Sequence, residues 1–288
     1  MKSIVSKMIR EAILKVYITI RNVTQSLGLH RFSIVKKITA VTVRNLKQDF
    51  AVANGHKMFL DKNDALQLSI EEYEPMTTKI FKEYITDGNT VLDLGANIGY
   101  FALLAGKLVG GGKVFAFEPD KDNFSIMCKN ITLNNYKNII PMEKAVTEQN
   151  EKIKLYLSGR VGDHRIFDSG DNRKSVEIEA VRLDDYLKDY KNHIDFIKID
   201  IQGSEYGALK GMNNIILSSP NLKIVIEYQT SMLKKAGTKP HLIIDFLIEH
   251  GFDIYTIDEN KLQMKLADVE KLKNNDYNGN LFCIKKSD

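Results

Sequence analysis

From Thr90 onward the chain alternates short apolar runs with longer stretches of helical character, and this alternation constrains the fold most strongly. Buried parallel strands read as continuous apolar runs, and the intervening helices act as crossover connections. Seven runs fit this description: residues 91–94, 113–117, 138–142, 194–200, 222–227, 252–257 and 281–285. The pattern therefore predicts an α/β fold with a seven-stranded sheet. No long apolar helix separates the last two runs, so we expect the final strand to be antiparallel.

An irregular insert, residues 152–183, separates the third and fourth runs. Two further strands are expected inside it, at 152–157 and 175–181. Between them the chain is rich in glycine and polar residues: Gly159, Gly162, Asp163, His164, Arg165, Ser169 and Gly170. Such a segment is typical of a loop that covers a functional site.

The first 47 residues carry ten Lys or Arg residues against a single acid, Glu11, in a chain whose overall net charge is +4. Apolar residues recur there at helical spacing, which predicts an amphipathic helix: Ile4, Met8, Ala12, Val16, Ile20, Val23 and Leu27. Interspersed charges argue against a secretory signal or a membrane span. Two interpretations stay open: a peripheral anchor on anionic lipid, or a helix packed on its own domain or on a sister subunit.

The sequence predicts two modules, residues 1–85 and 86–288. The first joins the basic arm to a hairpin, with Asn54-Gly55 as its turn between residues 51–53 and 58–60, and to a helix at about 75–85. Hydrophobic residues make up 43% of the chain and charged residues 27%, which excludes a disordered or fibrous protein. Cys128 and Cys283 are too few for a disulfide framework or a four-cysteine zinc site, which fits a reducing cytoplasm.

The first apolar run ends in the pattern Asp93-x-Gly95-x-x-x-Gly99 and opens directly into an apolar helix. We expect backbone amides at this helix start to meet a ligand carboxylate or phosphate, because glycines allow close approach. A dinucleotide fold prefers G-x-G-x-x-G, and Asn97 stands where its second glycine would be. The motif therefore favours a ligand without a pyrophosphate, although a purely structural turn remains open.

The second run ends in Phe117-Glu118-Pro119-Asp120. A carboxylate at the end of the strand beside the glycine turn can accept hydrogen bonds from both hydroxyls of a ribose. A solvated surface acid is the alternative for Glu118. The two motifs together indicate a nucleoside site.

The fourth run contains Lys198 inside an otherwise apolar strand, which is costly unless its ammonium group has a partner. Asp200, two residues later on the same face of the strand, can supply that partner. A purely structural ion pair is the alternative. The fifth run ends in Glu227, which places another carboxylate at the same edge of the sheet.

At this point the chain resembles a known family. Four ordered blocks, which begin at Asp93, Phe117, Leu183 and Ile197, are similar to the FkbM family of S-adenosylmethionine-dependent methyltransferases. The resemblance covers about residues 50–285. It implies a class I methyltransferase fold, which is Rossmann-like with an antiparallel last strand, and O-methylation, often of sugar hydroxyls. The family usually has glutamate where this chain has Gln202.

The resemblance also implies roles for individual residues. The turn at Gly95 to Gly99 is expected to hold the methionine part of S-adenosylmethionine, with Asp93 or a carbonyl near its ammonium group, Glu118 at the ribose and Glu143 near the adenine. The cofactor residues implied are Asp93, Gly95, Ala96, Asn97, Gly99, Tyr100, Phe101, Glu118, Pro119, Glu143 and Ala145.

A sugar hydroxyl is hardly acidic, so a base must take its proton as the new bond forms. The candidates are Asp200, Glu205, Glu227 and His164, and Asp200 is preferred because it ends the fourth strand. His164 is also a candidate for contact with the acceptor, or for a solvated loop side chain. Nothing in the spacing of the acids demands a metal ion.

The sequence thus favours an enzyme of the cytoplasm or of the membrane periphery that methylates a small molecule or a glycan. Two alternatives stay open: an NAD-dependent oxidoreductase, and a non-catalytic nucleoside-binding module. Nucleic acid is not an expected partner, because the basic arm lacks interleaved aromatic residues.

Overall fold

The computed structural model describes residues 50–61, 66, 68, 72–158 and 163–286. Internal contacts divide the chain into two units, Met1–Tyr73 and Glu74–Asp288. In the first unit, β1 (Phe50–Ala53) and β2 (His56–Phe59) pair antiparallel around Asn54 and Gly55, both at positive φ, which confirms the predicted hairpin. The amphipathic helix predicted within residues 1–47 lies outside the described residues, so its proposed lipid contact stays a prediction. None of the described helices is long and apolar enough to span a membrane.

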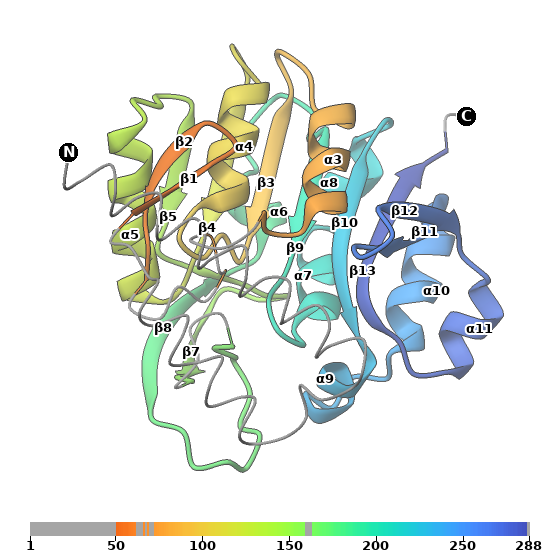
Figure 1. Cartoon of the computed structure of the whole chain (residues 1–288). Coiled ribbons are helices and arrows are strands. Elements are labelled where there is room, and N and C mark those ends of the chain that lie inside the picture. Colours follow the sequence, from red (N-terminus) through yellow and green to blue (C-terminus); the bar gives the residue numbers. More distant parts are fainter. Residues whose placement is uncertain (1–49, 62–65, 67, 69–71, 159–162, 287–288) are drawn as a thin grey trace, which may run out of the picture. The chain divides into compact units, whose positions relative to one another are not determined.

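An eight-stranded sheet forms the centre of the second unit, as far as the chain is described (Figure 1). Its order is β12-β11-β13-β10-β9-β3-β4-β5. The strands are β3 (Thr90–Leu94), β4 (Lys113–Phe117), β5 (Ile139–Met142), β9 (Phe196–Ile199), β10 (Lys223–Gln229), β11 (Phe252–Asp258), β12 (Gln263–Leu266) and β13 (Asn278–Lys285).

The seven predicted runs correspond to seven of these strands. The final strand, β13, is antiparallel to both of its neighbours, β10 and β11, as expected. The eighth strand, β12, pairs antiparallel with β11 at the edge of the sheet. Its four residues include no fully buried one, so no apolar run marked it in the sequence.

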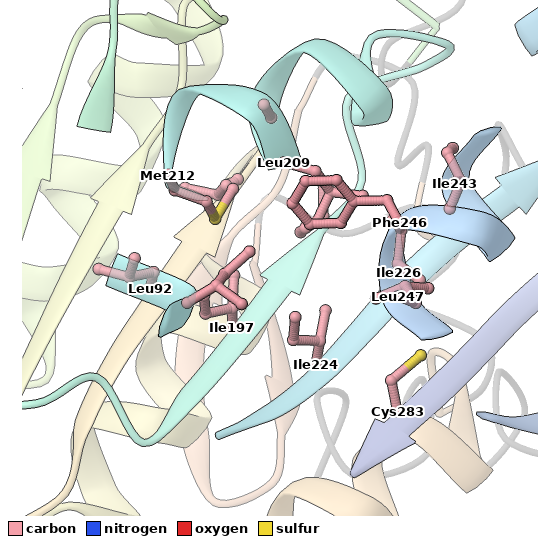
Figure 2. Close-up of a cluster of buried hydrophobic side chains, with 14 of the residues drawn as sticks. Leu92, Ile197, Leu209, Met212, Ile224, Ile226, Ile243, Phe246, Leu247 and Cys283 are labelled. Carbon is pink, nitrogen blue, oxygen red and sulfur yellow. The ribbon is translucent and has the colours of Figure 1, made fainter. Parts of the chain in front are cut away.

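One face of the sheet packs against α7 (Glu205–Gly211), α8 (Asn213–Ser218) and α10 (His241–Glu249), which are joined at its margins by α6 (Leu183–Tyr186), α9 (Thr230–Lys235) and α11 (Val269–Asn274). Figure 2 shows this core, in which Leu92, Ile197 and Ile224 from adjacent strands meet Met212 and Leu247. Alternate residues of a strand face opposite sides of the sheet. The residues between these leucines and isoleucines, Asp93 and Lys198 among them, therefore face the other side of the sheet.

The opposite face packs against α3 (Pro75–Tyr84), α4 (Tyr100–Leu108) and α5 (Lys121–Leu133). The ring of Phe81 in α3 lies 4.7 Å from that of Phe101 in α4 and 4.7 Å from that of Phe196 in β9. This packing groups α3 with the second unit, so the contact boundary falls after Tyr73 and differs from the predicted division after residue 85.

The insert forms a small sheet of its own. β7 (Glu151–Tyr156) and β8 (Ser175–Val181) pair antiparallel, which matches the two predicted strands, and β6 (Ala145–Val146) pairs parallel with β8. The segment between β7 and β8 is described from residue 163 onward.

Candidate active site

The site lies at one edge of the large sheet. β4, β3, β9 and β10 run parallel in adjacent positions, so their carboxyl ends share that edge. The chain places Gly95, Glu118 and Asp200 immediately after β3, β4 and β9. Ligands of open α/β sheets bind in the crevice outside these strand ends.

Gly95 brings the turn after β3 into contact with the end of β9. It adopts a φ of +83°, and a Cβ built on it would lie 1.9 Å from the backbone carbonyl oxygen of Asp200. Only glycine tolerates both this conformation and this approach. Glycine at this position therefore allows the turn after β3 to approach the end of β9 this closely.

The backbone amides of this turn are already used within the protein. Those of Gly95 and Ala96 both donate to the carbonyl oxygen of Phe117 at 2.9 Å, and that of Gly99 donates to the carbonyl of Ala96 at 2.8 Å. The amide of Asn97 donates to Glu118 Oε2 at 2.8 Å. The end of β4 thus supplies acceptors for three of these four amides, and the turn itself supplies the fourth. The expected contact between bare amides at the helix start and the ligand stays a prediction.

Glu118 is 6% exposed and joins the turn to the start of α5. Its two carboxylate oxygens accept hydrogen bonds from the amides of Asn97 and Asp120, the latter at 2.9 Å. Burial raises the pKa of Glu118 to about 8, although both hydrogen bonds act in the opposite direction. Each oxygen retains a lone pair, so the carboxylate has the capacity to accept from two ribose hydroxyls.

Two buried polar groups beside the turn have no hydrogen-bond partner among the described residues. They are the carboxylate of Asp93, which is 1% exposed, and Oδ1 of Asn97. Burial raises the pKa of Asp93 to about 6, while the charge of Lys198 opposes this rise. The backbone amide of Ala102 also lowers this pKa, although it makes no hydrogen bond of good geometry to the carboxylate. A buried carboxylate so weakly paired is costly unless a ligand supplies a donor. A cationic nucleoside such as S-adenosylmethionine, with an ammonium group and a ribose, fits this set of acceptors together with Glu118.

Tyr100 and Phe101, both predicted to contact the cofactor, take part in packing between helices. The hydroxyl of Tyr100 lies 3.1 Å from Oγ1 of Thr78 in α3, and both residues are buried. Phe101 packs on Phe81, and the ammonium group of Lys198 lies 4.8 Å from the centre of its ring. Both aromatic side chains therefore attach α4 to the elements around it.

The three remaining predicted cofactor residues differ in their surroundings. Pro119 is partly buried directly after Glu118. Glu143 is exposed after β5, and Ala145 is buried in β6, where it pairs with Ala180 of β8. No contact of the described residues assigns an adenine site to Glu143 or Ala145, so that role stays a prediction.

A partly buried polar cluster follows the end of β9. Lys198 Nζ lies 2.9 Å from Asp200 Oδ2, which confirms the predicted ion pair. The side-chain amide of Gln202 donates to Asp200 Oδ1 at 3.1 Å and to Glu227 Oε2 at 2.8 Å. The amide of Gln229 donates to the other oxygen of Glu227. The cluster therefore holds two carboxylates side by side, joined by one amide.

The two carboxylates of this cluster have opposite proton affinities. Burial disfavours the charge of Asp200, but the adjacent Lys198 ammonium outweighs it, so the pKa of Asp200 is lowered. Burial and the negative charge of Asp200 raise the pKa of Glu227 well above its usual value. Asp200 accordingly favours its ionised form, and Glu227 holds a proton more readily than Asp200 does.

Glu205, another predicted base, turns toward the backbone of its own loop. It is 2% exposed, and its Oε1 accepts hydrogen bonds from the amides of Gly203 at 2.9 Å and Ile201 at 3.3 Å. Burial raises the pKa of Glu205 to about 7. These contacts hold the loop that carries Gln202.

His164 lies in the insert, next to the end of β4. Its Nδ1 accepts from the amide of Ser158 at 3.0 Å, and its Nε2 lies 4.0 Å from Asp120 Oδ2. The neutral ring therefore carries its proton on Nε2. The described contacts place this histidine near the Glu118 segment and show none to Asp200.

Two residues of the cluster were not singled out as functional in the sequence. In the sequence, Gln202 stands out only by its difference from the glutamate that is usual in the family, and no motif marks Gln229. The usable signal for Gln229 is its position two residues after Glu227 in a strand, because this spacing puts both side chains on one face.

The FkbM methyltransferase domain matches residues 93–254 of the chain. Methyltransferase sdnD of Sordaria araneosa is 24% identical, over 61% of this chain and 82% of its own length. Hexuronic acid methyltransferase AglP of Haloferax volcanii is 25% identical, over 62% of this chain and 66% of its own length. Among solved structures, M. jannaschii TYW2 in complex with AdoMet is similar at 15% identity, covering 83% of this chain and 86% of that one, with a TM-score of 0.44.

The matched family spans more than half of the chain, and it includes every strand end of the candidate site. Because the matching domain is a methyltransferase, neither of the two alternative functions, an NAD-dependent oxidoreductase or a non-catalytic nucleoside-binding module, is retained for this site. The chain belongs to the FkbM methyltransferase family and is an enzyme that uses S-adenosylmethionine as its methyl donor.

Proposed function

We propose that the acceptor is a hydroxyl group of a sugar and that Asp200 is the base of an O-methylation. The observation that carries the proposal is the partly buried carboxylate pair of Asp200 and Glu227, joined by Gln202 beside the Gly95 turn. An ionised carboxylate at this strand end suits an acceptor that must lose a proton. The relative named as a hexuronic acid methyltransferase supports a sugar acceptor.

Glu118 and Asp93 are the residues proposed to hold the donor. Glu118 accepts from the ribose hydroxyls, and Asp93 accepts from the ammonium group, because these carboxylates retain unused acceptor capacity. When bound, S-adenosylmethionine supplies an electrophilic methyl group on a positively charged sulfur. Asn97, whose Oδ1 is buried without a partner among the described residues, adds a further acceptor at the same place.

The carboxylate of Asp200 would take the proton of the acceptor hydroxyl while that oxygen bonds the methyl carbon and the bond from this carbon to the donor sulfur breaks, with S-adenosylhomocysteine as the leaving group. Lys198 and Gln202 fix the position of this carboxylate before the reaction by one hydrogen bond each. Such positioning supplies much of the rate of a group transfer. The proton enters a pair of coupled carboxylates, so Asp200 and Glu227 titrate together afterwards.

The other candidate bases are less suited by their contacts. Burial and the charge of Asp200 raise the pKa of Glu227, so Glu227 is less readily available in the ionised form that a base needs. Glu205 uses its Oε1 to hold backbone amides of its loop. His164 lies beside Asp120 at the end of β4. Asp200 is therefore the base that the geometry supports best.

The test incubates the full chain with S-adenosylmethionine carrying a deuterated methyl group and with a panel of monosaccharides and oligosaccharides. Mass spectrometry then detects the labelled methyl group and its position. Asp200→Asn should lower kcat about 100-fold or more while binding of S-adenosylhomocysteine persists. Asp253→Asn is the matched control. Asp253 pairs with Lys286 near the amino-terminal end of β11, whereas the candidate site lies at the carboxyl ends of the parallel strands.

Methylation of a sugar oxygen by the wild type, lost in Asp200→Asn alone, would support the proposal. Full turnover by Asp200→Asn would remove Asp200 as the base. Transfer of the label to nitrogen or carbon of another acceptor class would overturn the sugar hydroxyl as the acceptor.

A further inference from the structure

An extended segment of the insert begins at Asp163 and lies beside residues that follow β4 and β9. The backbone of Arg165 pairs with that of Tyr156 at the end of β7, through hydrogen bonds of 2.8 and 3.2 Å. Neighbouring side chains of an extended segment point to opposite sides. His164 accordingly reaches toward Asp120 after β4, whereas Arg165 and Phe167 share the other side.

On this other side of the segment, the ring of Phe167 packs against the loop that follows β9. A Cβ built on Gly203 would lie 3.0 Å from Phe167 Cε1 and 3.1 Å from Met232 Cγ in α9. The guanidinium of Arg165 lies 5.6 Å from the centre of the Phe167 ring. Arg165 is thus separated by one aromatic ring from the loop that carries Gln202.

The guanidinium of Arg165 is buried and largely unused. Its side chain is 6% exposed, and its one side-chain hydrogen bond among the described residues runs from Nη2 to Asp163 Oδ1 at 2.8 Å. Its Nε is buried and has no partner among the described residues. A guanidinium has five N–H donors, so a buried arginine with a free Nε lacks an acceptor.

Arg173 of the same cluster differs in this respect. Its Nε donates to Asp171 Oδ2 at 2.7 Å, its Nη1 to the carbonyl of Asp163 at 2.6 Å and its Nη2 to Asp163 Oδ2 at 3.1 Å. Arg173 therefore holds the folded shape of the insert. Arg165 is the arginine of the pair with an edge left for a ligand.

The geometry points to Arg165 as the residue that binds a carboxylate of the methyl acceptor, so that the acceptor is an acidic sugar. This inference rests on the proposed sugar-hydroxyl acceptor. The planar N–H edge of arginine matches a carboxylate through two parallel hydrogen bonds. Asp163 and Asp171 already balance Arg165 and Arg173, so a carboxylate with one charge is accommodated more readily than a phosphate with two.

The test measures binding to the full chain saturated with S-adenosylhomocysteine. Glucuronate and galacturonate are compared with glucose and galactose, and glucose 6-phosphate distinguishes a phosphate site from a carboxylate site. The wild type should bind the acidic sugars about tenfold or more tightly than the neutral ones. Arg165→Met should lose this preference, and Arg165→Lys should keep part of it.

Arg173→Met is the matched control, because it removes an arginine of the same cluster whose three guanidinium nitrogens each donate within the insert. It should keep the preference for acidic sugars. Binding of S-adenosylhomocysteine should be unchanged in every variant, which shows that the fold is intact.

The inference is overturned if the wild type shows no preference for acidic over neutral sugars, if glucose 6-phosphate binds most tightly, or if Arg173→Met loses the preference as completely as Arg165→Met. Methylation of a neutral sugar oxygen with equal efficiency would overturn this inference and leave the proposed function standing. Absence of methyl transfer to any sugar, acidic or neutral, would instead count against the proposed function.

Discussion

The side-chain amide of Gln202 donates a hydrogen bond to Glu227 Oε2 at 2.8 Å, from a loop residue to a strand residue 25 positions later. The same nitrogen donates to Asp200 Oδ1, so one neutral group bridges two partly buried carboxylates. Gln202 adopts a φ of 54°, a conformation uncommon for residues with a side chain. The arrangement makes Gln202 a positioning residue of the pair.

Gln202→Glu should therefore destabilise the protein, by about 1 kcal/mol or more at neutral pH, because it adds a third carboxylate to a partly buried pair. The neighbouring acids raise the pKa of the new side chain, so the loss should grow as pH rises and shrink as pH falls. Chemical denaturation at several pH values measures this. Gln263→Glu in the exposed strand β12 should change the free energy of unfolding by less than about 0.5 kcal/mol. Equal, pH-independent losses in both variants would contradict the role of Gln202.

Glu118 should make the ligand-free protein less stable as pH rises. Its pKa is 4.5 by reference and about 8 in the fold, so between these values the folded chain binds a proton that the unfolded chain has lost. The contribution of Glu118 to stability is thus fully present below about pH 4.5 and lost as pH rises through about 8. Glu118→Gln should flatten the fall of the melting temperature over this range. A slope identical to that of the wild type would contradict the buried acid.

The same substitution should weaken binding of S-adenosylhomocysteine by about tenfold or more, because a neutral amide replaces the acceptor proposed for the ribose. Calorimetry measures the affinity. Glu143→Gln is the comparison, since Glu143 is exposed after β5 and its adenine role is untested. Unchanged affinity in Glu118→Gln would remove the ribose assignment.

Gly95→Ala should destabilise far more than Gly88→Ala. Both glycines adopt nearly the same φ, +83° and +85°, so both variants pay about 1 kcal/mol for the left-handed conformation. A Cβ at Gly88 has nothing within 4 Å, whereas a Cβ at Gly95 would lie 1.9 Å from the carbonyl oxygen of Asp200. We expect a loss above about 3 kcal/mol or failure to fold for Gly95→Ala only. Similar melting temperatures for the two variants would refute the close approach.

Glu259→Gln should loosen α3. The carboxylate of Glu259 accepts from the amides of Met76 at 2.6 Å and Thr77 at 3.0 Å, at the first turn of the helix. A negative charge there accepts hydrogen bonds from amides that the first turn leaves without a partner in the helix. It also interacts favourably with the positive end of the helix dipole. The variant should lose about 1 to 2 kcal/mol, with faster amide exchange in α3. Glu151→Gln, in an exposed position of β7, is the control.

The sequence by itself determined the parallel strands and the edge at which the site lies. Hydrophobic runs and the glycine turn are local signals, and the carboxyl ends of parallel strands necessarily share an edge. The pairing of Lys198 with Asp200 was also predictable, because residues two apart in a strand lie on one face. The exposed edge strand β12 gave no such apolar signal.

Only the tertiary structure decided which groups remain available to a ligand. The amides of Gly95 and Ala96 looked free in the sequence, yet Phe117 at the end of the next strand accepts from both. Asp93 is left without a partner among the described residues, and Gln202 meets Glu227 across the loop. Each of these facts depends on a neighbour distant in the sequence, and local periodicity carries no information about whether such a neighbour satisfies a given donor or acceptor.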